Sequence, residues 1–157
     1  MRVYLVQHGE ARPEEEDPQR RLTDEGFRNV QKVADFLRPL GLKLETIWHS
    51  GKDRARQTAE ILGGALSASQ GLLQRDGLAP KDPVAPVKQA IEQSVGDLMI
   101  VGHLPFLGKL ASLLVADSQE PEIVAFKFGC VVCLERPEGG RWKLAWMIVP
   151  ALFNAQA

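Results

Sequence analysis

Apolar and polar positions follow a regular pattern over the first 115 residues, where short apolar runs are each followed by a longer stretch with helical spacing. Residues 2–7, 45–49 and 97–103 are the short runs, and their length and β-branched side chains predict strands. The run at 97–103 is apolar almost without interruption, which is typical of a strand that is buried on both faces.

The stretches after these runs repeat apolar residues every three or four positions and predict four helices. Thr23 is expected to cap the first helix, and Ser50 or Asp53 the second, because their side chains accept hydrogen bonds from first-turn N–H groups. Pro105 is placed to begin the last helix. The apolar stripes are Phe27, Val30, Ala34 and Leu37; Ala55, Thr58, Ala59, Leu62 and Ala65; Val84, Val87, Ile91 and Val95; and Leu107, Leu110, Ala111 and Leu114.

Other segments lack a helical period. Residues 67–82 contain several Gly, Pro and charged residues and are expected to form a long loop. Strands are predicted near 122–128 and 130–135, and the turn sequence at 136–141 precedes another. In that last strand every second residue is expected to face the core, the set being Trp142, Leu144, Trp146 and Ile148.

Strands that alternate with helices predict parallel βαβ units. The expected fold is therefore α/β, with three layers in which helices cover both faces of a mostly parallel central sheet. The late strands are expected to extend this sheet, with antiparallel strands at its edge. The chain has 157 residues and shows neither an internal repeat nor a linker, so we expect a single domain over residues 1–157.

The formal net charge of −1 gives no reason to expect a nucleic-acid partner or an anionic membrane surface. No apolar stretch approaches the roughly 20 residues that cross a bilayer. Gln7 and Glu10 interrupt the N-terminal run where a signal peptide needs an apolar segment. We expect a cytoplasmic protein without a nucleic-acid or membrane partner, and the sequence does not indicate its oligomeric state.

Cys130 and Cys133 have the C-x-x-C spacing that metal and redox sites use. They lie in a predicted strand, where residues three apart point to opposite faces. No second Cys/His pair is present to complete a zinc site. Both cysteines are therefore interpreted as small core or strand residues.

All three histidines of the chain follow predicted strands: His8, His49 and His103. In open α/β sheets ligands bind at the carboxyl ends of the strands, so these side chains could meet in one site. Four arginines lie in the loop before, or at the start of, the helices that follow: Arg20, Arg21, Arg54 and Arg56. Arginine and helix N-termini both favour phosphoryl oxygens, and a neutral imidazole can attack phosphorus. The arginines disfavour a metal ion, because a cation gains nothing beside guanidinium groups.

The stretches "QHGEA" (7–11), "RRLTDEG" (20–26), "SGKDRARQT" (50–58) and "VGHLPFLGKL" (101–110) together carry a family resemblance. The chain resembles the histidine phosphatase superfamily, and in detail its short SixA-type phosphohistidine phosphatases. This resemblance implies the phosphoglycerate mutase-like α/β fold of that family, and neither a metal nor an organic cofactor.

The resemblance also implies residue roles. His8 would be the nucleophile that becomes phosphorylated, Arg20 and Arg54 would bind phosphoryl oxygens, and His103 would complete the pocket. Gly9 and residue 7 would belong to the phosphate-binding segment. The family has arginine at residue 7, whereas this chain has Gln7, which can donate a neutral hydrogen bond but supplies no charge. The expected loss is on the order of 1–2 kcal/mol of phosphate binding. No role is implied for His49.

The short chain leaves little room for an inserted segment that carries a general acid, and Glu10 and Asp76 are the candidate acids that remain. Imidazole is a far better leaving group than a sugar alkoxide and needs less acid help. We therefore expect a phosphohistidine-bearing protein as substrate, such as a signalling phosphotransfer domain or a phosphotransferase-system carrier. Two alternatives stay open: a phosphatase for small phosphate esters, and a weakly active or non-catalytic phospho-binding protein because of Gln7. Mutase chemistry is disfavoured by the length of the chain.

Overall fold

A computed structural model describes residues 1–154 of the chain. The helices are α1 (Asp24–Leu37), α2 (Asp53–Gly63), α3 (Ala85–Gln93) and α4 (Phe106–Ala116), with the 3-10 turns η1 (Arg38–Leu40) and η2 (Pro150–Asn154). The strands are β1 (Arg2–Gln7), β2 (Lys43–Leu44), β3 (Thr46–His49), β4 (Ser67–Ala68), β5 (Leu72–Gln74), β6 (Leu98–Gly102), β7 (Val131–Glu135) and β8 (Lys143–Ile148).

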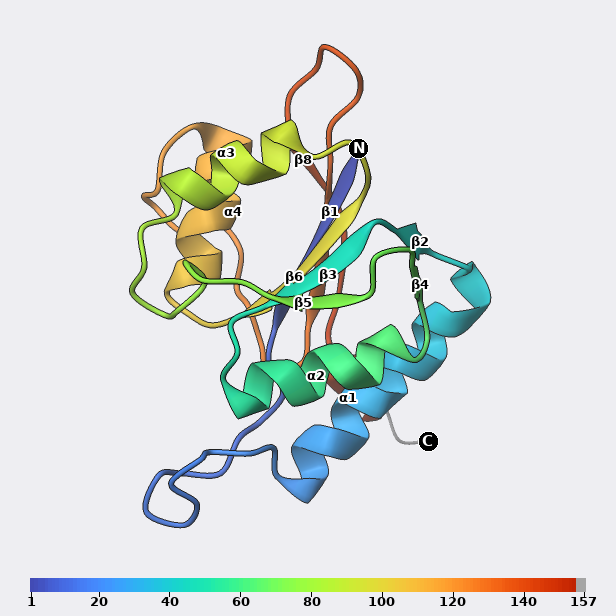
Figure 1. Ribbon diagram of the computed structural model, residues 1–157, viewed down its shortest axis with the longest axis vertical. Helices are drawn as coiled ribbons and strands as arrows, with labels where there is room; N and C mark the ends of the chain where they lie inside the picture. The colour runs from blue at the N-terminus through green and yellow to red at the C-terminus, as the bar shows by residue number, and fades with distance from the viewer. Residues whose placement is uncertain (155–157) are drawn as a thin grey trace.

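Six of these strands form one sheet in the order β5-β3-β6-β1-β7-β8, and β2 pairs with β4 outside it. The strands β5, β3, β6 and β1 are parallel, while β7 runs antiparallel to its neighbours β1 and β8. Helices α1 and α2 pack together on one face, and α3 and α4 on the other (Figure 1). The predicted three-layer α/β fold with a mostly parallel sheet is confirmed.

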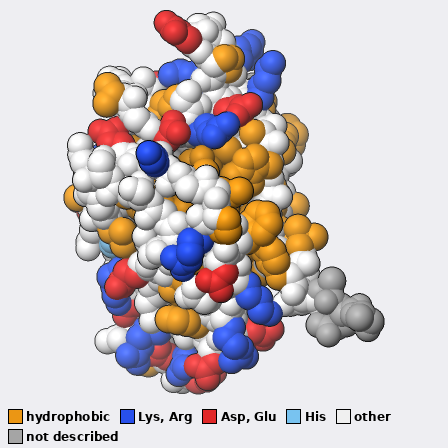
Figure 2. Space-filling view, turned by 90° about the vertical axis from the view of Figure 1, so that its right-hand side faces the viewer, with side chains coloured by type: hydrophobic (Ala, Val, Ile, Leu, Met, Phe, Trp, Pro, Cys, Tyr) orange, Lys and Arg blue, Asp and Glu red, His pale blue; other side chains and the backbone are white. Residues whose placement is uncertain are grey.

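The central strands are buried on both faces, which explains their unbroken apolar sequence. In β1, Val3 and Leu5 belong to the core beneath α3 and α4, whereas Tyr4 and Val6 belong to the core beneath α1 and α2. Most charged side chains remain outside, with Asp17 as a buried exception, and Figure 2 shows both signs intermixed at the lower end of one face. No helix within residues 1–154 is long and apolar enough to cross a membrane.

The predicted start of α1 is confirmed, because the Thr23 hydroxyl accepts a hydrogen bond from Gly26 N at 2.9 Å. The prediction for α2 is wrong. Its N-cap residue is Lys52, which makes no side-chain cap, and Asp53 is already helical. Ser50 is not the cap because it lies two residues earlier, where its hydroxyl contacts a histidine of the candidate site.

The predicted loop at 67–82 contains two short strands. β4 pairs with β2, and β5 pairs in parallel with β3, so that Gln74 lies opposite His49. All three residues of β5 are exposed at the sheet edge, so no buried face imposes an alternation on its sequence. Three residues are also too few to show a period.

Two other predictions, for Val95 and for residues 122–128, are wrong. Val95 lies beyond the end of α3 and is 95% exposed, so it is not part of that helical stripe. The segment 122–128 is not a strand. Two of its backbone N–H groups donate to side chains instead of to a neighbouring strand. Ile123 N donates to Ser112 Oγ, and Lys127 N donates to Cys130 Sγ.

The alternation predicted for 142–148 is interrupted by a bulge. The register between β7 and β8 shifts, so that Leu144 lies opposite Leu134 while Trp146 lies opposite Cys133. Trp142 therefore packs in the core beneath α3 and α4, whereas Trp146 and Ile148 pack in the other core. The cysteine prediction holds, because buried Cys130 and Cys133 lie in opposite cores.

Candidate active site

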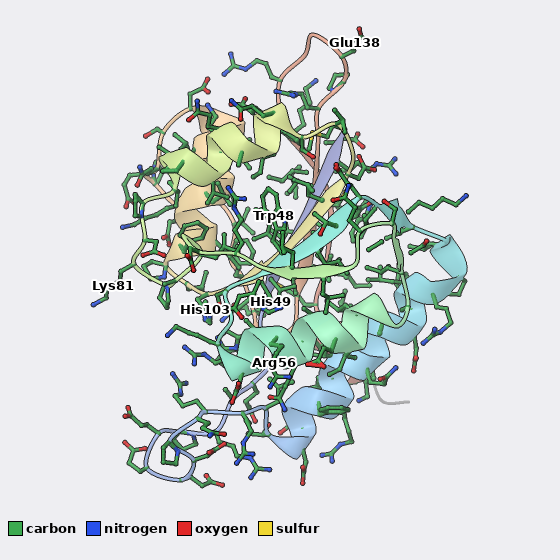
Figure 3. The ribbon with its side chains drawn as sticks, in the orientation of Figure 1. Trp48, His49, Arg56, Lys81, His103 and Glu138 are labelled. Atoms are coloured by element: carbon green, nitrogen blue, oxygen red, sulfur yellow. The ribbon has the colours of Figure 1, made fainter. Side chains whose placement is uncertain are left out.

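The carboxyl ends of β1 and β6 bring two histidines together. Gln7 is paired with Gly102 at the last position of the parallel ladder, so His8 and His103 both follow it directly. The backbone N–H of His8 donates to the Gly102 carbonyl at 3.0 Å, and the two imidazole centroids are 5.0 Å apart. Both rings are buried. Figure 3 shows His103 at this edge of the sheet, above the start of α2.

The hydrogen bond of the His8 ring determines which nitrogen is free. Nδ1 lies 2.7 Å from the Gly9 carbonyl oxygen, which can only accept, so Nδ1 carries the proton. Nε2 then keeps its lone pair when the ring is neutral. Burial lowers the pKa of His8 to about 4, the Gly9 carbonyl opposes this shift, and the charges of Arg54 and Arg20 lower the pKa further. The ring is therefore neutral at physiological pH, in the form that can act as a nucleophile.

Gly9 permits a close approach between β1 and α1. A Cβ atom at this position would lie 2.8 Å from Val30 Cγ2 and 3.2 Å from the Gly26 carbonyl oxygen. The Gly9 N–H donates to Thr58 Oγ1 at 3.0 Å, and Thr58 in turn donates to the Arg54 carbonyl at 2.8 Å. The turn after His8 is thus bound directly to the first turns of α2.

A second contact binds the loop before α1 to the same helix. The side chain of Gln57 on α2 accepts a hydrogen bond from Leu22 N at 2.9 Å. Arg20, two residues earlier, has a left-handed backbone with φ of 49°, and its Nε donates to the Arg12 carbonyl at 3.2 Å. Sparsely populated backbone conformations of this kind are concentrated at functional sites.

The structure separates the two adjacent arginines of this loop. Arg21 forms an ion pair with Asp17 at 3.1 Å, and the hydrogen bonds from Arg21 lower the pKa of Asp17 to about 2. Arg20 has no carboxylate partner within residues 1–154. The guanidinium that remains available to a ligand is therefore that of Arg20.

Arg54 lies in the first turn of α2, and its Nε atom is buried without a hydrogen-bond partner in the described part of the chain. Burial, and then the positive charge of Arg20, lower the pKa of Arg54. Two like charges held close together without a counter-ion favour an anionic ligand between them. The arrangement can therefore bind a phosphoryl group.

His103 has one partnered and one unpartnered nitrogen. Its Nε2 lies 2.7 Å from Ser50 Oγ, which already accepts a hydrogen bond from Lys52 N at 3.3 Å. When the Ser50 hydroxyl donates its proton to Nε2, the proton of the neutral ring lies on Nδ1. That Nδ1 is buried and has no partner among residues 1–154. Burial is the main cause that lowers the pKa of His103 to about 3, followed by the charges of His8 and Arg54.

Gln7 lies at the end of β1 and is buried, with 7% of the residue's surface exposed. The Oε1 atom is buried and finds no hydrogen-bond partner within residues 1–154. A buried acceptor without a donor is costly, because it loses its hydrogen bonds to water without replacing them. A ligand group or an ordered water molecule at this position would relieve that cost.

Neither candidate acid forms an ion pair with a histidine within residues 1–154. The Glu10 carboxylate accepts a hydrogen bond from the Thr23 hydroxyl at 2.8 Å, which holds it at the N-terminus of α1. Asp76 is exposed in the turn after β5. His49 lies at the same sheet edge, where its Nδ1 accepts from Gly51 N. Burial and then Arg56 lower the pKa of His49, so this ring faces α2.

Sequence reasoning missed two neighbours of the histidine pair. Ser50 was expected to cap a helix, although its position in the S-x-x-x-R motif could have indicated a place in the site. Phe128 was expected in a strand, but its half-exposed ring lies 5.6 Å from the His8 ring. Nothing in the sequence around Phe128 indicates that contact, because the segment is irregular and distant in the chain.

A polar cleft of about 430 Å³ opens beside the arginines. Its walls come from the loop before α1 and from the start of α2. The lining residues are Glu14, Pro18, Gln19, Arg20, Gly51, Lys52, Asp53 and Arg54. Within residues 1–154 no three His, Cys, Asp or Glu side chains are grouped so as to hold a metal ion.

A buried histidine pair, with two arginines that have no carboxylate partner within residues 1–154, is an arrangement that suits a phosphoryl ligand. Comparison with known proteins agrees: residues 3–79 match the model of the histidine phosphatase superfamily, branch 1. The chain belongs to this superfamily, and its class of activity is that of a phosphatase.

Several relatives extend the comparison beyond the matched segment. An uncharacterized protein of Picosynechococcus is 38% identical over 122 residues, which cover 73% of each chain. The phosphohistidine phosphatase SixA of Escherichia coli is 24% identical over 155 residues, covering 96% of this chain and 94% of SixA. A solved structure of the protein histidine phosphatase SixA complexed with tungstate has a TM-score of 0.82 at 23% identity, covering 98% and 99% of the two chains. The SixA-type fold is thereby confirmed over nearly the whole chain.

Proposed function

We propose that this protein hydrolyses phosphohistidine on a partner protein, through a phosphoryl group carried on His8. The observation that carries the proposal is the His8 ring: its Nδ1 proton is donated to the Gly9 carbonyl, while Nε2 keeps its lone pair. Arg20 and Arg54, which have no carboxylate partner within residues 1–154, bind the phosphoryl oxygens. The SixA proteins that resemble this chain are named for the same substrate class.

The reaction takes two displacements. In the first, His8 Nε2 forms a bond to phosphorus while the bond from phosphorus to the substrate imidazole breaks. The electron pair stays on the departing nitrogen, which takes a proton from water. In the second, a water molecule attacks phosphorus, the bond to Nε2 breaks with its electron pair returning to His8, and the water proton leaves to solvent. The Nδ1–H group of His103 donates to a phosphoryl oxygen in both steps.

The placement of the acids supports phosphohistidine over phosphate esters. Glu10 is bound to Thr23, and Asp76 is exposed in a turn. An alkoxide leaving group needs a strong acid beside it, whereas an imidazole leaves without one. The cleft beside the arginines is open and polar, as access for a histidine on a protein surface requires.

The test compares two substrates in one assay. A phosphohistidine-bearing phosphotransfer protein and glycerol 3-phosphate, an ester with an alkoxide leaving group, are each incubated with the wild type and with His8→Ala. We expect fast loss of the phosphohistidine, slow ester hydrolysis, and an acid-labile phosphoenzyme that is absent from His8→Ala. Fast ester turnover with the phosphohistidine protein left intact would refute the proposed substrate and favour a small-molecule phosphatase.

Gln7 favours a second candidate, a protein that binds phosphoryl groups without turning them over. The amide supplies no charge, and its buried Oε1 has no partner in the described part of the chain. Under this alternative the wild type binds phosphate but forms no phosphoenzyme, and Gln7→Arg restores phosphoenzyme formation. Under the proposed function the wild type forms it already, and Gln7→Arg changes the rate by about tenfold at most.

A further inference from the structure

The candidate site has a neutral side chain at the end of β1, where the superfamily pattern has a cation. Gln7 is more than nine-tenths buried there, beside the two histidines. The charges of Arg54 and Arg20 contribute to the lowered pKa of His8. A phosphoryl group carries close to two negative charges at neutral pH, so a third cation near the pocket would improve binding.

Lys52 is in a position to supply that cation. It stands directly before α2, two residues from Arg54, and lines the same cleft as Arg20 and Arg54. Its backbone N–H donates to Ser50 Oγ, the atom that contacts His103. The Lys52 charge is also among the causes that lower the pKa of His103, which agrees with its position near the ring.

The acidic residues of the cleft do not neutralise Lys52. Asp53 forms an ion pair with Arg56 at 3.3 Å. Glu14 lines the cleft, but no carboxylate lies within ion-pair distance of the Lys52 ammonium in residues 1–154. Lys52 is exposed, so its side chain is free to turn towards an anion in the cleft.

We propose that Lys52 binds the phosphoryl group together with Arg20 and Arg54, and that its ammonium replaces the positive charge that Gln7 does not supply. The inference rests on the proposed function only in that both place a phosphoryl group at His8. It assigns a binding role to a residue outside the motif positions. It also predicts that residues 7 and 52 are energetically coupled.

The experiment is a double-mutant cycle on the binding of inorganic phosphate, measured by titration calorimetry at low ionic strength. The four proteins are the wild type, Lys52→Met, Gln7→Arg and the double variant. We expect Lys52→Met to weaken phosphate binding by about threefold to tenfold in the wild-type background. In the Gln7→Arg background the same change should cost less than about twofold, because the arginine already supplies the charge.

Two controls make the result specific. Lys43→Met removes an exposed lysine at the amino end of the sheet and should leave phosphate binding unchanged. Lys52→Arg keeps the charge and should retain at least half of the wild-type affinity. Should Gln7→Arg fail to fold, the salt dependence replaces it: log Kd should rise less steeply with salt in Lys52→Met than in the wild type.

The outcomes separate this inference from the proposed function, because phosphate binding does not require turnover. An effect of Lys52→Met no larger than that of Lys43→Met would overturn the inference. If Lys52→Met weakens phosphate binding equally in the wild type and in Gln7→Arg, then Lys52 does not replace the charge that is missing at residue 7. A protein that shows the expected coupling but leaves phosphohistidine intact would refute the proposed substrate and leave the role of Lys52 in place.

Discussion

At the scale of single residues, hydrogen bonds to the two rings decide what each histidine can do. The Gly9 carbonyl holds the proton of His8 on Nδ1, and Ser50 is placed to hold that of His103 on Nδ1 as well. The first arrangement presents a lone pair and the second presents a donor, so two chemically identical side chains take opposite roles. The contact partners, and not the histidines themselves, create this difference.

Replacement of Ser50 by alanine tests the second of these hydrogen bonds. Without the hydroxyl, nothing favours the Nδ1–H form of His103, and we expect kcat to fall by about tenfold with a smaller change in KM. The 15N chemical shifts of the His103 ring should show a mixture of tautomers in Ser50→Ala and one tautomer in the wild type. Ser69→Ala changes an exposed serine that follows β4 and does not line the cleft, and is the control. An unchanged His103 spectrum in Ser50→Ala would contradict the assignment.

Gly9→Ala tests the close approach between β1 and α1. The added Cβ would lie 2.8 Å from Val30 Cγ2, so the turn that carries His8 must move. We expect a loss of about 1–3 kcal/mol in the free energy of unfolding, measured with urea, and weaker phosphate binding. Gly64→Ala is the matched control, because Gly64 has an ordinary φ of −69°. That change should be neutral or slightly stabilising. Equal effects of the two substitutions would show that the contact at Gly9 is unimportant.

At the scale of elements, the start of α1 is tied to the segment after His8. The Thr23 hydroxyl accepts from Gly26 N and donates to the Glu10 carboxylate, and Thr23 N donates to the Glu10 carbonyl. A Cβ atom on Gly26 would lie in contact with the Glu10 carbonyl oxygen, so the helix and this segment touch. The N-cap of α1 thus also positions the chain that leaves the site.

Thr23→Ala should therefore cost more than an isolated helix cap. It removes the bond to Gly26 N and leaves the Glu10 carboxylate without its hydroxyl partner. We expect a decrease of about 1–2 kcal/mol in the free energy of unfolding, measured with urea. Thr23→Ser keeps the hydroxyl and should recover most of this loss. Equal losses in both variants would point to packing of the Thr23 methyl group instead.

At the scale of the whole molecule, the buried histidines make the stability of the fold depend on pH. Burial lowers the pKa of His8 to about 4 and that of His103 to about 3, whereas both titrate near 6.5 in the unfolded chain. Between these values the unfolded state binds more protons than the folded state. The free energy of unfolding therefore falls as the pH drops from about 6.5 towards 4.

We expect urea unfolding to show a clear loss of stability between pH 7 and pH 5 in phosphate-free buffer. Phosphate must be absent, because a ligand that binds only the folded state would stabilise it. The variant His103→Asn removes one of the two buried rings, so its loss of stability between the same pH values should be smaller. An identical pH dependence in wild type and variant would show that His103 is not buried in its neutral form.

The fold was largely predictable from the sequence, because strands that are buried on both faces have unbroken apolar runs and helices that pack on a core have periodic apolar residues. The unbroken apolar run of β6 corresponds to contacts with both cores, and Val30, Ala34 and Leu37 of the α1 stripe pack in one core, whereas Phe27 of that stripe is 48% exposed. The failures have a different cause. The edge strand β5 has no buried face, and residues 122–128 satisfy their N–H groups with side chains from elsewhere. Neither condition leaves a period that a local pattern can show.

The sequence by itself determined which groups the site contains. Residues that follow the strands must gather at one sheet edge, so His8 and His103 were recognisable without coordinates, as were Arg20 and Arg54 from their motifs. The tertiary structure decided the state of each group. Asp17, only four residues away, neutralises Arg21 but not Arg20, and the hydroxyl of Thr23 binds the Glu10 carboxylate at the start of α1. The fold also brings Lys52, just before α2, into the cleft that Arg20 lines from the loop before α1.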